Sequence, residues 1–299
     1  MRRYFILFLK GMAMGIANVI PGVSGGTIAL ITRIYEKLIN SLKSFDKNAL
    51  ELLISLKIRK FVSYVNLDFL FAVFIGSIIS VFSIANLFKY LFEEHPILIW
   101  ALFFGLILAS IYYVGKRITE WNKINIIILL CAALLTFGIS MIEPANENDN
   151  LFFVFICGII GISGMLLPGL SGSFILILLG NYELLMVNAI ANLDYILLIT
   201  FILGSIAGLF GFSHIISWLL KKHKNKMLSL LTGFILGSLY VIWPWKEKGN
   251  TEIINGVEKT LSYNCYIPQE LNTETLFAIG LIIAGSLIVV ALESFSKID

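Results

Sequence analysis

Charged residues are scarce in this sequence. Asp, Glu, Lys and Arg together make up 14% of its 299 residues, whereas apolar residues make up 58% and the mean hydropathy is +0.90. In a soluble domain, roughly a quarter of all residues are charged. The composition therefore excludes an ordinary soluble domain and predicts a protein that lies in a lipid bilayer.

Cysteine is also rare, with three residues in the chain. Cys131 and Cys157 fall in apolar segments and Cys265 falls in a polar loop, without the paired spacing of a disulfide framework or a metal site. The net charge of +3 is small. We expect no metal, no cofactor and no nucleic-acid partner.

Alternating ten-residue segments, which are typical of membrane β-barrels, are absent, so the sequence predicts a helical membrane protein. Several apolar runs approach the roughly 20 residues that a helix needs to cross a bilayer. The runs are 4–20, 26–39, 67–92, 97–115 and 124–142, then 151–167, 173–190, 195–220, 227–244 and 274–292. The first two of each set are short and flank a Pro-Gly-rich break, which predicts two re-entrant or broken hairpins, 4–39 and 151–190.

The basic residues predict the orientation of the chain. With the N-terminus in the cytoplasm, 18 of the 22 Lys and Arg residues fall on the cytoplasmic side, many of them in the connector 40–66. The C-terminus is then also cytoplasmic. Lys10 interrupts the apolar run after Arg2 and Arg3 and no cleavage site follows, so we expect this segment to be retained.

An internal repeat divides the chain. The segment PGVSGGTIALITRIYE at 21–36 aligns without gaps with PGLSGSFILILLGNYE at 168–183, and 76–78 and 105–114 align with 204–206 and 233–242. Chance similarity between apolar helices rarely preserves Pro-Gly-x-Ser-Gly and Tyr-Glu at one spacing. The sequence predicts two repeats, 1–142 and 151–292, with opposite membrane topology, as in many secondary transporters.

The two breaks predict an anion site. Pro21 ends the first half-helix, and Ser24 or Thr27 can cap the next one, as can Ser171 and Ser173 in the second repeat. The start of a helix attracts anions such as phosphate, and inverted repeats bring two starts together at the midplane. The alternative is that each break is a tight turn in a packed hairpin, with glycines for close helix contact.

Ionisable residues beyond the breaks have two interpretations each. Arg33 either binds a phosphate or extends to the cytoplasmic surface. Glu36 and Glu183 either couple transport to a proton or another cation or anchor their helix ends, and anchoring is favoured. His95 and His223 align in the repeat, which suggests a proton relay, but their place in short charged connectors favours a surface role.

The segments NVIPGVSGGTIALI and LLPGLSGSFILILLG resemble the bacterial polyprenyl-phosphate transporters of the PopT type, over nearly the whole chain. The resemblance implies a plasma-membrane protein that returns undecaprenyl phosphate from the outer to the inner leaflet. Met165 stands where the first repeat has Asn18. The family's motif falls on Asn18, Pro21, Gly22, Ser24, Gly25, Gly26 and Thr27, and on Pro168, Gly169, Ser171, Gly172 and Ser173.

The expected function is therefore alternating-access transport of a polyprenyl phosphate whose phosphate lies between the two breaks, with Arg33 helping to hold it. One alternative is a proton- or sodium-coupled carrier of a small soluble anion. Another is an intramembrane lipid-phosphate enzyme, which would need a nucleophile and a base or metal ligands on one face. The three His residues are dispersed, so we expect no enzymatic activity.

Overall fold

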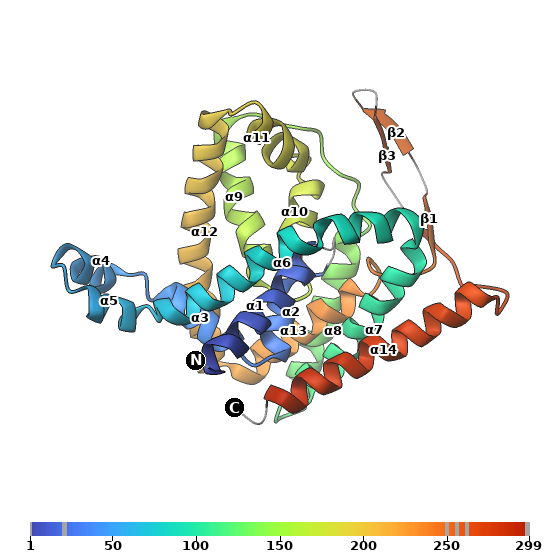
Figure 1. The fold of residues 1–299 in the computed structure, drawn as a ribbon, viewed down its shortest axis with the longest axis horizontal. Helices are drawn as coiled ribbons and strands as arrows, with labels where there is room; N and C mark the ends of the chain where they lie inside the picture. The colour runs from blue at the N-terminus through green and yellow to red at the C-terminus, as the bar shows by residue number, and fades with distance from the viewer. Residues whose placement is uncertain (1, 20–22, 249–250, 255–256, 261–262, 297–299) are drawn as a thin grey trace.

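The computed structural model describes residues 2–19, 23–248, 251–254, 257–260 and 263–296, and the described part is almost entirely helical (Figure 1). The N-terminal half contains α1 (Arg2–Val19), α2 (Gly25–Ile31), α3 (Tyr35–Lys43), α4 (Lys47–Ile54), α5 (Ile58–Tyr64), α6 (Leu67–Glu94), α7 (Pro96–Gly115) and α8 (Lys123–Ile139). The C-terminal half contains α9 (Leu151–Leu166), α10 (Gly172–Leu178), the π-helix η1 (Leu184–Asn188), α11 (Ala189–Ala191), α12 (Tyr195–Lys222), α13 (Lys224–Ser238) and α14 (Thr273–Ser296).

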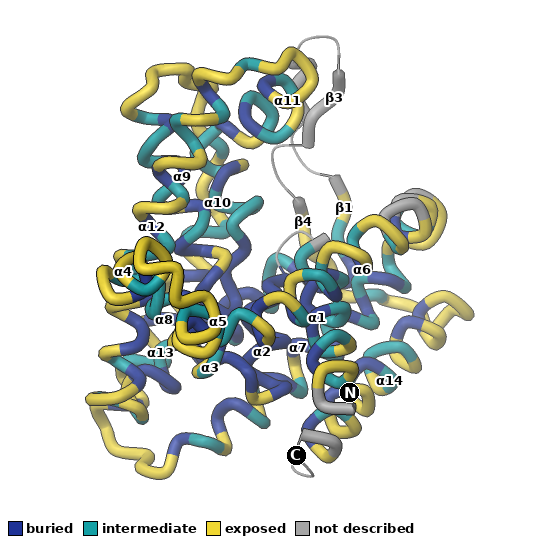
Figure 2. The backbone as a smooth tube through the Cα atoms, turned by 60° about the vertical axis from the view of Figure 1, so that its left-hand side comes forward, coloured by how far each residue is buried: buried dark blue, intermediate teal, exposed yellow. Residues whose placement is uncertain are grey.

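Four of the described helices are long and apolar enough to cross a membrane, and three more are apolar but shorter. The long stretches are Leu67–Ile84, Pro96–Gly115, Tyr195–Lys222 and Thr273–Ser294, and the shorter ones are Tyr4–Asn18, Lys123–Ile139 and Leu151–Leu166. Large apolar side chains are exposed along α6, α8, α12 and α14. Figure 2 draws many residues of α12 and α14 in yellow, the colour of exposed residues. Lipid solvates such surfaces, so the prediction of an all-α, multi-pass membrane protein is confirmed.

The polar loop that holds Cys265 carries short strands. β1 (Lys246–Lys248) pairs antiparallel with β4 (Tyr263–Cys265), and β2 (Thr251–Ile254) pairs antiparallel with β3 (Val257–Thr260). The two ladders form a hairpin that extends away from the helices in Figure 1. The predicted helix 227–244 is also shorter than expected, because α13 ends at Ser238 and turns follow it.

Four helix pairs build the body of the molecule. Helix α1 packs along α6 and α9 along α12, while α7 packs along α14 and α8 along α13. The sequence alignment matches α7 with α13, and α8 and α14 are the helices that follow them, so each half supplies one helix to both of the last two pairs. This exchange is the arrangement expected of two related units with a pseudo-twofold axis between them.

Glycines let two of these pairs approach closely at matching positions. A Cβ on Gly76 of α6 would overlap the carbonyl oxygen of Phe8 in α1. At the aligned positions, a Cβ on Gly204 of α12 would overlap the carbonyl oxygen of Phe155 in α9. The same backbone contact thus occurs in both halves, and it requires a residue without a side chain, as is common where membrane helices pack.

The second short element of each predicted hairpin is interrupted, which corrects the prediction of continuous runs at 26–39 and 173–190. Helix α2 ends before Arg33 and α3 begins at Tyr35, while α10 ends before Gly180. Arg33 has φ +62° and Gly180 has φ +76°. A left-handed residue ends an α-helix, and sequence periodicity alone does not reveal it.

Candidate functional site

The helices that follow the two breaks start with the same backbone geometry. We call residues 18–27 the first break and residues 165–174 the second break. Ser24 precedes α2 with φ −114° and ψ 131°, and Ser171 precedes α10 with φ −110° and ψ 130°. Both helices have seven residues. Pro21 and Gly22 lie outside the described residues, whereas their counterparts Pro168 and Gly169 are buried.

The amide groups at the start of α2 are already bonded within the first break. The Gly25 amide donates to Asn18 Oδ1 at 2.8 Å, and the Gly26 amide donates to Ser24 Oγ at 3.1 Å. The Thr27 amide donates to the Ser24 carbonyl at 2.9 Å. The first three donors of α2 are thus satisfied by the protein itself, so in this conformation they do not face an anion.

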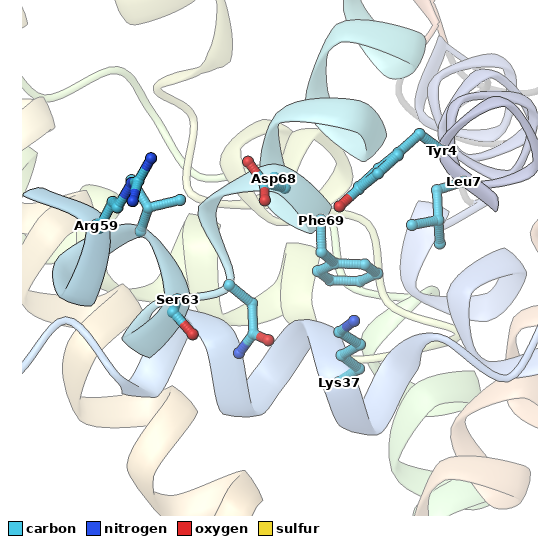
Figure 3. A pocket seen from close by; sticks show the side chains of 9 residues that line it. Tyr4, Leu7, Lys37, Arg59, Ser63, Asp68 and Phe69 are labelled. Carbon is cyan, nitrogen blue, oxygen red and sulfur yellow. The ribbon is translucent and has the colours of Figure 1, made fainter. Parts of the chain in front are cut away.

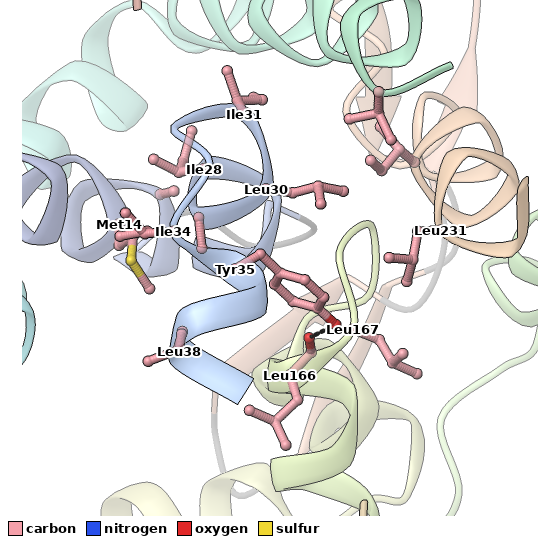
Figure 4. Packing of buried hydrophobic residues seen from close by; sticks show 14 of the residues in the cluster. Met14, Ile28, Leu30, Ile31, Ile34, Tyr35, Leu38, Leu166, Leu167 and Leu231 are labelled. Atoms are coloured by element: carbon pink, nitrogen blue, oxygen red, sulfur yellow. Dashed lines mark hydrogen bonds between the residues drawn. The ribbon is translucent and has the colours of Figure 1, made fainter. Parts of the chain in front are cut away.

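The two breaks contact each other directly. The Ser24 hydroxyl lies 3.4 Å from the Leu167 carbonyl, to which it can donate, and the Gly169 amide donates to Thr27 Oγ1 at 3.1 Å. The Tyr35 hydroxyl donates to the Leu166 carbonyl at 3.0 Å, the bond dashed in Figure 4. Side chains of the first repeat therefore bond the unpaired backbone groups at the end of α9, and the predicted proximity of the breaks is present in the fold.

The second break differs in its hydroxyl groups. Ser171 takes the N-cap position, but its hydroxyl bonds Ser173 Oγ at 2.8 Å and caps no amide of α10, contrary to the predicted capping role. Ser173 occupies the position of Gly26. In the first break the N-cap hydroxyl bonds the Gly26 amide, whereas in the second break it bonds the Ser173 side chain. Gly172 and Ser173 are also partly exposed, whereas Ser24 and Thr27 are buried. The second break is the more open of the two.

Buried apolar residues surround the contact between the breaks. Figure 4 shows Leu30 of α2 on the side that faces Leu231 of α13 and Ile28 on the opposite side, with the Tyr35 ring reaching toward the end of α9. Tyr35 is 1% exposed. Polar groups at this depth are stable only because they bond one another.

The C-terminal end of α2 is bound by an arginine that the sequence analysis left unassigned. Arg117 follows α7 and donates from Nη1 to the Leu30 carbonyl at 2.8 Å and from Nη2 to the Ile31 carbonyl at 3.2 Å. These are two of the last carbonyls of α2, which have no partner inside the helix. Burial lowers the pKa of the Arg117 guanidinium, and the nearby Glu293 carboxylate opposes that shift.

One carboxylate joins Arg117 to Arg33. Oε2 of Glu293 in α14 accepts from Arg117 Nη2 at 3.1 Å, and Oε1 accepts from Arg33 Nη2. The Glu293 side chain is 6% exposed, against 41% for Arg33 and 23% for Arg117. We call Arg33, Arg117 and Glu293 the arginine cluster. Neither interpretation of Arg33 included this ion pair, and the only sequence signal was a single acid just after a long apolar run.

A cavity of about 580 Å³ opens beside the arginine cluster. Arg33 and Arg117 line it together with Lys224, whose Nζ lies 3.0 Å from Glu36 Oε1. The Glu36 and Lys224 side chains are both more than half exposed, so their ion pair contributes little stability. Glu36 therefore lies in a surface ion pair, in keeping with the anchoring interpretation.

A smaller cavity of about 330 Å³ lies where α5 meets α1, α3 and α6 (Figure 3). Its lining includes Lys37, Arg59 and Asp68. Lys37 extends toward the ring of Phe69, with Nζ 4.6 Å from the ring centroid. This cavity lies where the connector 40–66 meets α1, α3 and α6, and no described residue of either break lines it.

The remaining candidates lie at helix junctions. Glu183 precedes η1 and is partly buried. His95 joins α6 to α7 and His223 joins α12 to α13, and both have φ −135° and ψ 51°. The aligned histidines thus occupy the same kind of single-residue junction. Among the described residues, no three His, Cys, Asp or Glu side chains come together as metal ligands.

Comparison with known proteins places this geometry in a family. Residues 14–259 match the model of the undecaprenyl phosphate translocase-like family. The polyprenyl-phosphate transporter of Vibrio cholerae is 36% identical over 98% of this chain and 97% of its own length. The polyprenyl-phosphate transporter of Staphylococcus aureus is 30% identical over 80% of this chain and 86% of its own length. No solved structure matches the chain. The chain therefore belongs to the undecaprenyl phosphate translocase-like family.

Proposed function

We propose that this protein is a transporter that moves undecaprenyl phosphate, or a similar polyprenyl phosphate, from the outer to the inner leaflet of the bacterial plasma membrane. It has no enzymatic step, and both termini are cytoplasmic. Its family and its two relatives named as polyprenyl-phosphate transporters support the substrate class. The positions of 18 of its 22 basic residues support the orientation.

The contact between the two breaks is the observation that carries the proposal. Ser24 and Thr27 bond the backbone at Leu167 and Gly169, so the start of α2 lies against the segment that joins α9 to α10, inside the protein. A phosphate there exchanges water for hydroxyl and amide donors, which lowers the large cost of bringing its charge into a medium of low dielectric constant. The isoprenoid tail stays in lipid beside the exposed apolar helices.

Transport requires the two repeats, 1–142 and 151–292, to move relative to each other. The exchanged pairs α7 with α14 and α8 with α13 support a pseudo-twofold arrangement in which the repeats rock about the site. In the conformation described here the first break is closed by its own hydrogen bonds and the second is more open. The phosphate binds first at Ser171 and Ser173, and the hydroxyls of Ser24 and Thr27 join as the contact between the breaks loosens.

A leaflet assay in reconstituted vesicles tests this function. A fluorescent polyprenyl phosphate would be followed as it becomes protected from an external reagent, with wild-type protein and with Ser24→Ala, Ser171→Ala and Arg33→Ala. We expect transport by the wild type and slower transport by each variant. Unchanged transport in all three variants would defeat the site assignment, and a wild type that moves no lipid would defeat the function.

A small soluble anion is the competing cargo. The same vesicles, loaded without polyprenyl phosphate and supplied with labelled phosphate and a proton or sodium gradient, separate the two. The proposal predicts no accumulation of the soluble anion above protein-free vesicles. Accumulation that depends on either gradient would replace the lipid with a soluble substrate.

A further inference from the structure

The cavity beside the arginine cluster concentrates positive charge around one carboxylate. Arg33, Arg117 and Lys224 line it and supply three positive charges. Glu36 in the lining and Glu293 behind the two arginines supply two negative charges, so the described surroundings carry a net charge of 3 − 2 = +1. A cavity of this sign attracts an anion.

The arginines have donors that Glu293 does not use. The Nε atom of Arg117 is buried and has no hydrogen-bond partner among the described residues. The Arg33 side chain is 41% exposed and lines the cavity. Arg33 is itself the left-handed residue that follows α2. Guanidinium groups bind phosphate through paired N–H donors, so two of them beside one cavity favour a phosphate as its ligand.

Helix α2 connects this cavity to the breaks. Its first residue is Gly25, in the first break, and Arg117 binds the carbonyls of its last residues, Leu30 and Ile31. Seven residues of α-helix span about 10 Å. The first break and the arginines therefore lie at opposite ends of one short helix.

The corresponding end of α10 has no such charge. The carbonyl of Leu178, which aligns with Ile31, accepts from the backbone amide of Ala145 at 2.9 Å. The Asn181 side chain bonds the backbone amide and carbonyl of Asn148 at 2.9 and 2.7 Å. Neutral groups thus bind the end of α10, whereas two arginines lie at the end of α2.

We infer that the cavity at the end of α2 is a second binding site for the phosphate of the lipid substrate, where Arg33 and Arg117 bind the phosphate in competition with the Glu293 carboxylate. The inference rests on the proposed function and assigns the site to the cytoplasmic face. A phosphomonoester carries about −1.5 to −2 charges at neutral pH, more than one carboxylate, so it displaces Glu293 from the guanidinium groups. When the phosphate leaves, Glu293 returns and keeps the arginines paired.

Equilibrium binding to the purified full-length protein tests the site. The probe is farnesyl phosphate, a short isoprenoid phosphomonoester, titrated calorimetrically in detergent, with farnesol and inorganic phosphate as comparison ligands. The variants are Arg33→Gln, Arg117→Gln and Glu293→Gln. Glu274→Gln is the matched control, because Glu274 lies in the first turn of the same helix α14 at its opposite end.

We expect Arg33→Gln and Arg117→Gln to weaken farnesyl phosphate binding by about 10- to 100-fold, the effect of losing a hydrogen bond to a charged group. Glu293→Gln tightens binding by about tenfold, because the amide keeps the shape but competes less for the guanidinium groups. Glu274→Gln leaves binding unchanged. Arg117 also holds the end of α2, so Arg33→Gln decides the result if Arg117→Gln does not fold.

Several outcomes would overturn the inference. Unchanged binding in Arg33→Gln, or weaker binding in Glu293→Gln, would show that the phosphate does not compete with Glu293 for the guanidinium groups. Farnesol that binds as tightly as farnesyl phosphate shows that the tail, not the phosphate, is bound. Inorganic phosphate that binds equally tightly makes the cavity a site for free phosphate.

The leaflet assay separates this inference from the proposed function. If the wild type moves lipid and Arg33→Gln neither binds more weakly nor transports more slowly, the second site is wrong and the function stands. If farnesyl phosphate binding depends on Arg33 and Glu293 as expected but the wild type moves no lipid, the anion site stands and the transport function is wrong.

Discussion

The two breaks lead into helices with the same N-cap conformation, and they differ in how their polar groups are used. In the first, Asn18 and Ser24 bond the amides that begin α2, and Ser24 and Thr27 also contact the second break. In the second, the buried Ser171 bonds Ser173, which is partly exposed together with Gly172. The repeated sequence thus fixes the helix starts, while the substitutions between copies make one break closed and the other accessible.

A second contrast lies at the far ends of the same half-helices. Two arginines lie at the end of α2, and backbone and amide groups bind the end of α10. If the repeats are inverted, the cationic end lies at the cytoplasmic face and the neutral end at the outer face. On the proposed function, an anion released from the breaks is therefore held at only one of the two ends.

The largest expected effect is the loss of Arg117. Arg117→Met removes the arginine donors from the Leu30 and Ile31 carbonyls and one partner of the buried Glu293 carboxylate, so we expect a loss of about 3 kcal/mol in the free energy of unfolding. Thermal unfolding in detergent measures it. Lys116→Met is the matched control at the adjacent exposed position, and an equal shift in both variants would contradict a specific role.

The next effect concerns the left-handed residue that ends α10. Gly180→Ala places a Cβ on a residue with φ +76°, and this Cβ also overlaps the Ala145 carbonyl oxygen. We expect the free energy of unfolding to fall by about 2 kcal/mol. Gly138→Ala in α8 has open space around the new Cβ and should be neutral or slightly stabilising. Urea unfolding measures the stability of both variants. Equal stability would show that the backbone at Ala145 moves easily to make room for the new Cβ.

Matched substitutions at the two N-cap serines sharpen the first contrast. Ser24→Ala removes the bond to the Gly26 amide in a buried site and should cost about 1 kcal/mol. Ser171→Ala breaks only its bond to Ser173 and should cost less than half of that, while it slows lipid transport at least as much. Melting temperatures and leaflet assays on the same preparations test both parts. A larger stability loss in Ser171→Ala would reverse the assignment of closed and open breaks.

The smallest effect is a dependence of stability on pH at the other end of the molecule. Lys246 lies 3.5 Å from the centre of the Trp100 ring, and burial lowers its pKa from 10.5 to about 8. Between these values the unfolded chain binds the proton and the folded chain has lost it, so the free energy of unfolding rises with pH. We expect the melting temperature of the wild type to rise by a few degrees relative to Lys246→Met from pH 8 to pH 10. Parallel curves would show that Lys246 titrates normally.

Sequence alone predicted much of the fold because two of its signals are local and strong. Long apolar runs gave the helices to within a few residues, as at 67–92 against Leu67–Glu94. The doubled Pro-Gly-x-Ser-Gly motif located both helix starts. The same reasoning placed the end of α2 too late, because Arg33 adopts a left-handed conformation that glycine usually signals and arginine does not.

The arginine cluster could not be predicted because its members are far apart in the sequence. Arg33, Arg117 and Glu293 come from three segments, and each has an ordinary explanation as a charge near the end of a membrane helix. Tertiary packing of α14 against α2 brings them together. The unequal use of hydroxyls at Ser24 and Ser171 likewise depends on which backbone groups the other repeat presents.

Photolabelling of the bound lipid tests the central claim most directly. A polyprenyl phosphate with a diazirine next to its phosphate would be bound to the wild-type protein, irradiated and mapped by mass spectrometry. We expect labels within residues 24–35 and 165–173, where the breaks and α2 lie. Labels confined to the exposed apolar surfaces of α6 and α12 would contradict it.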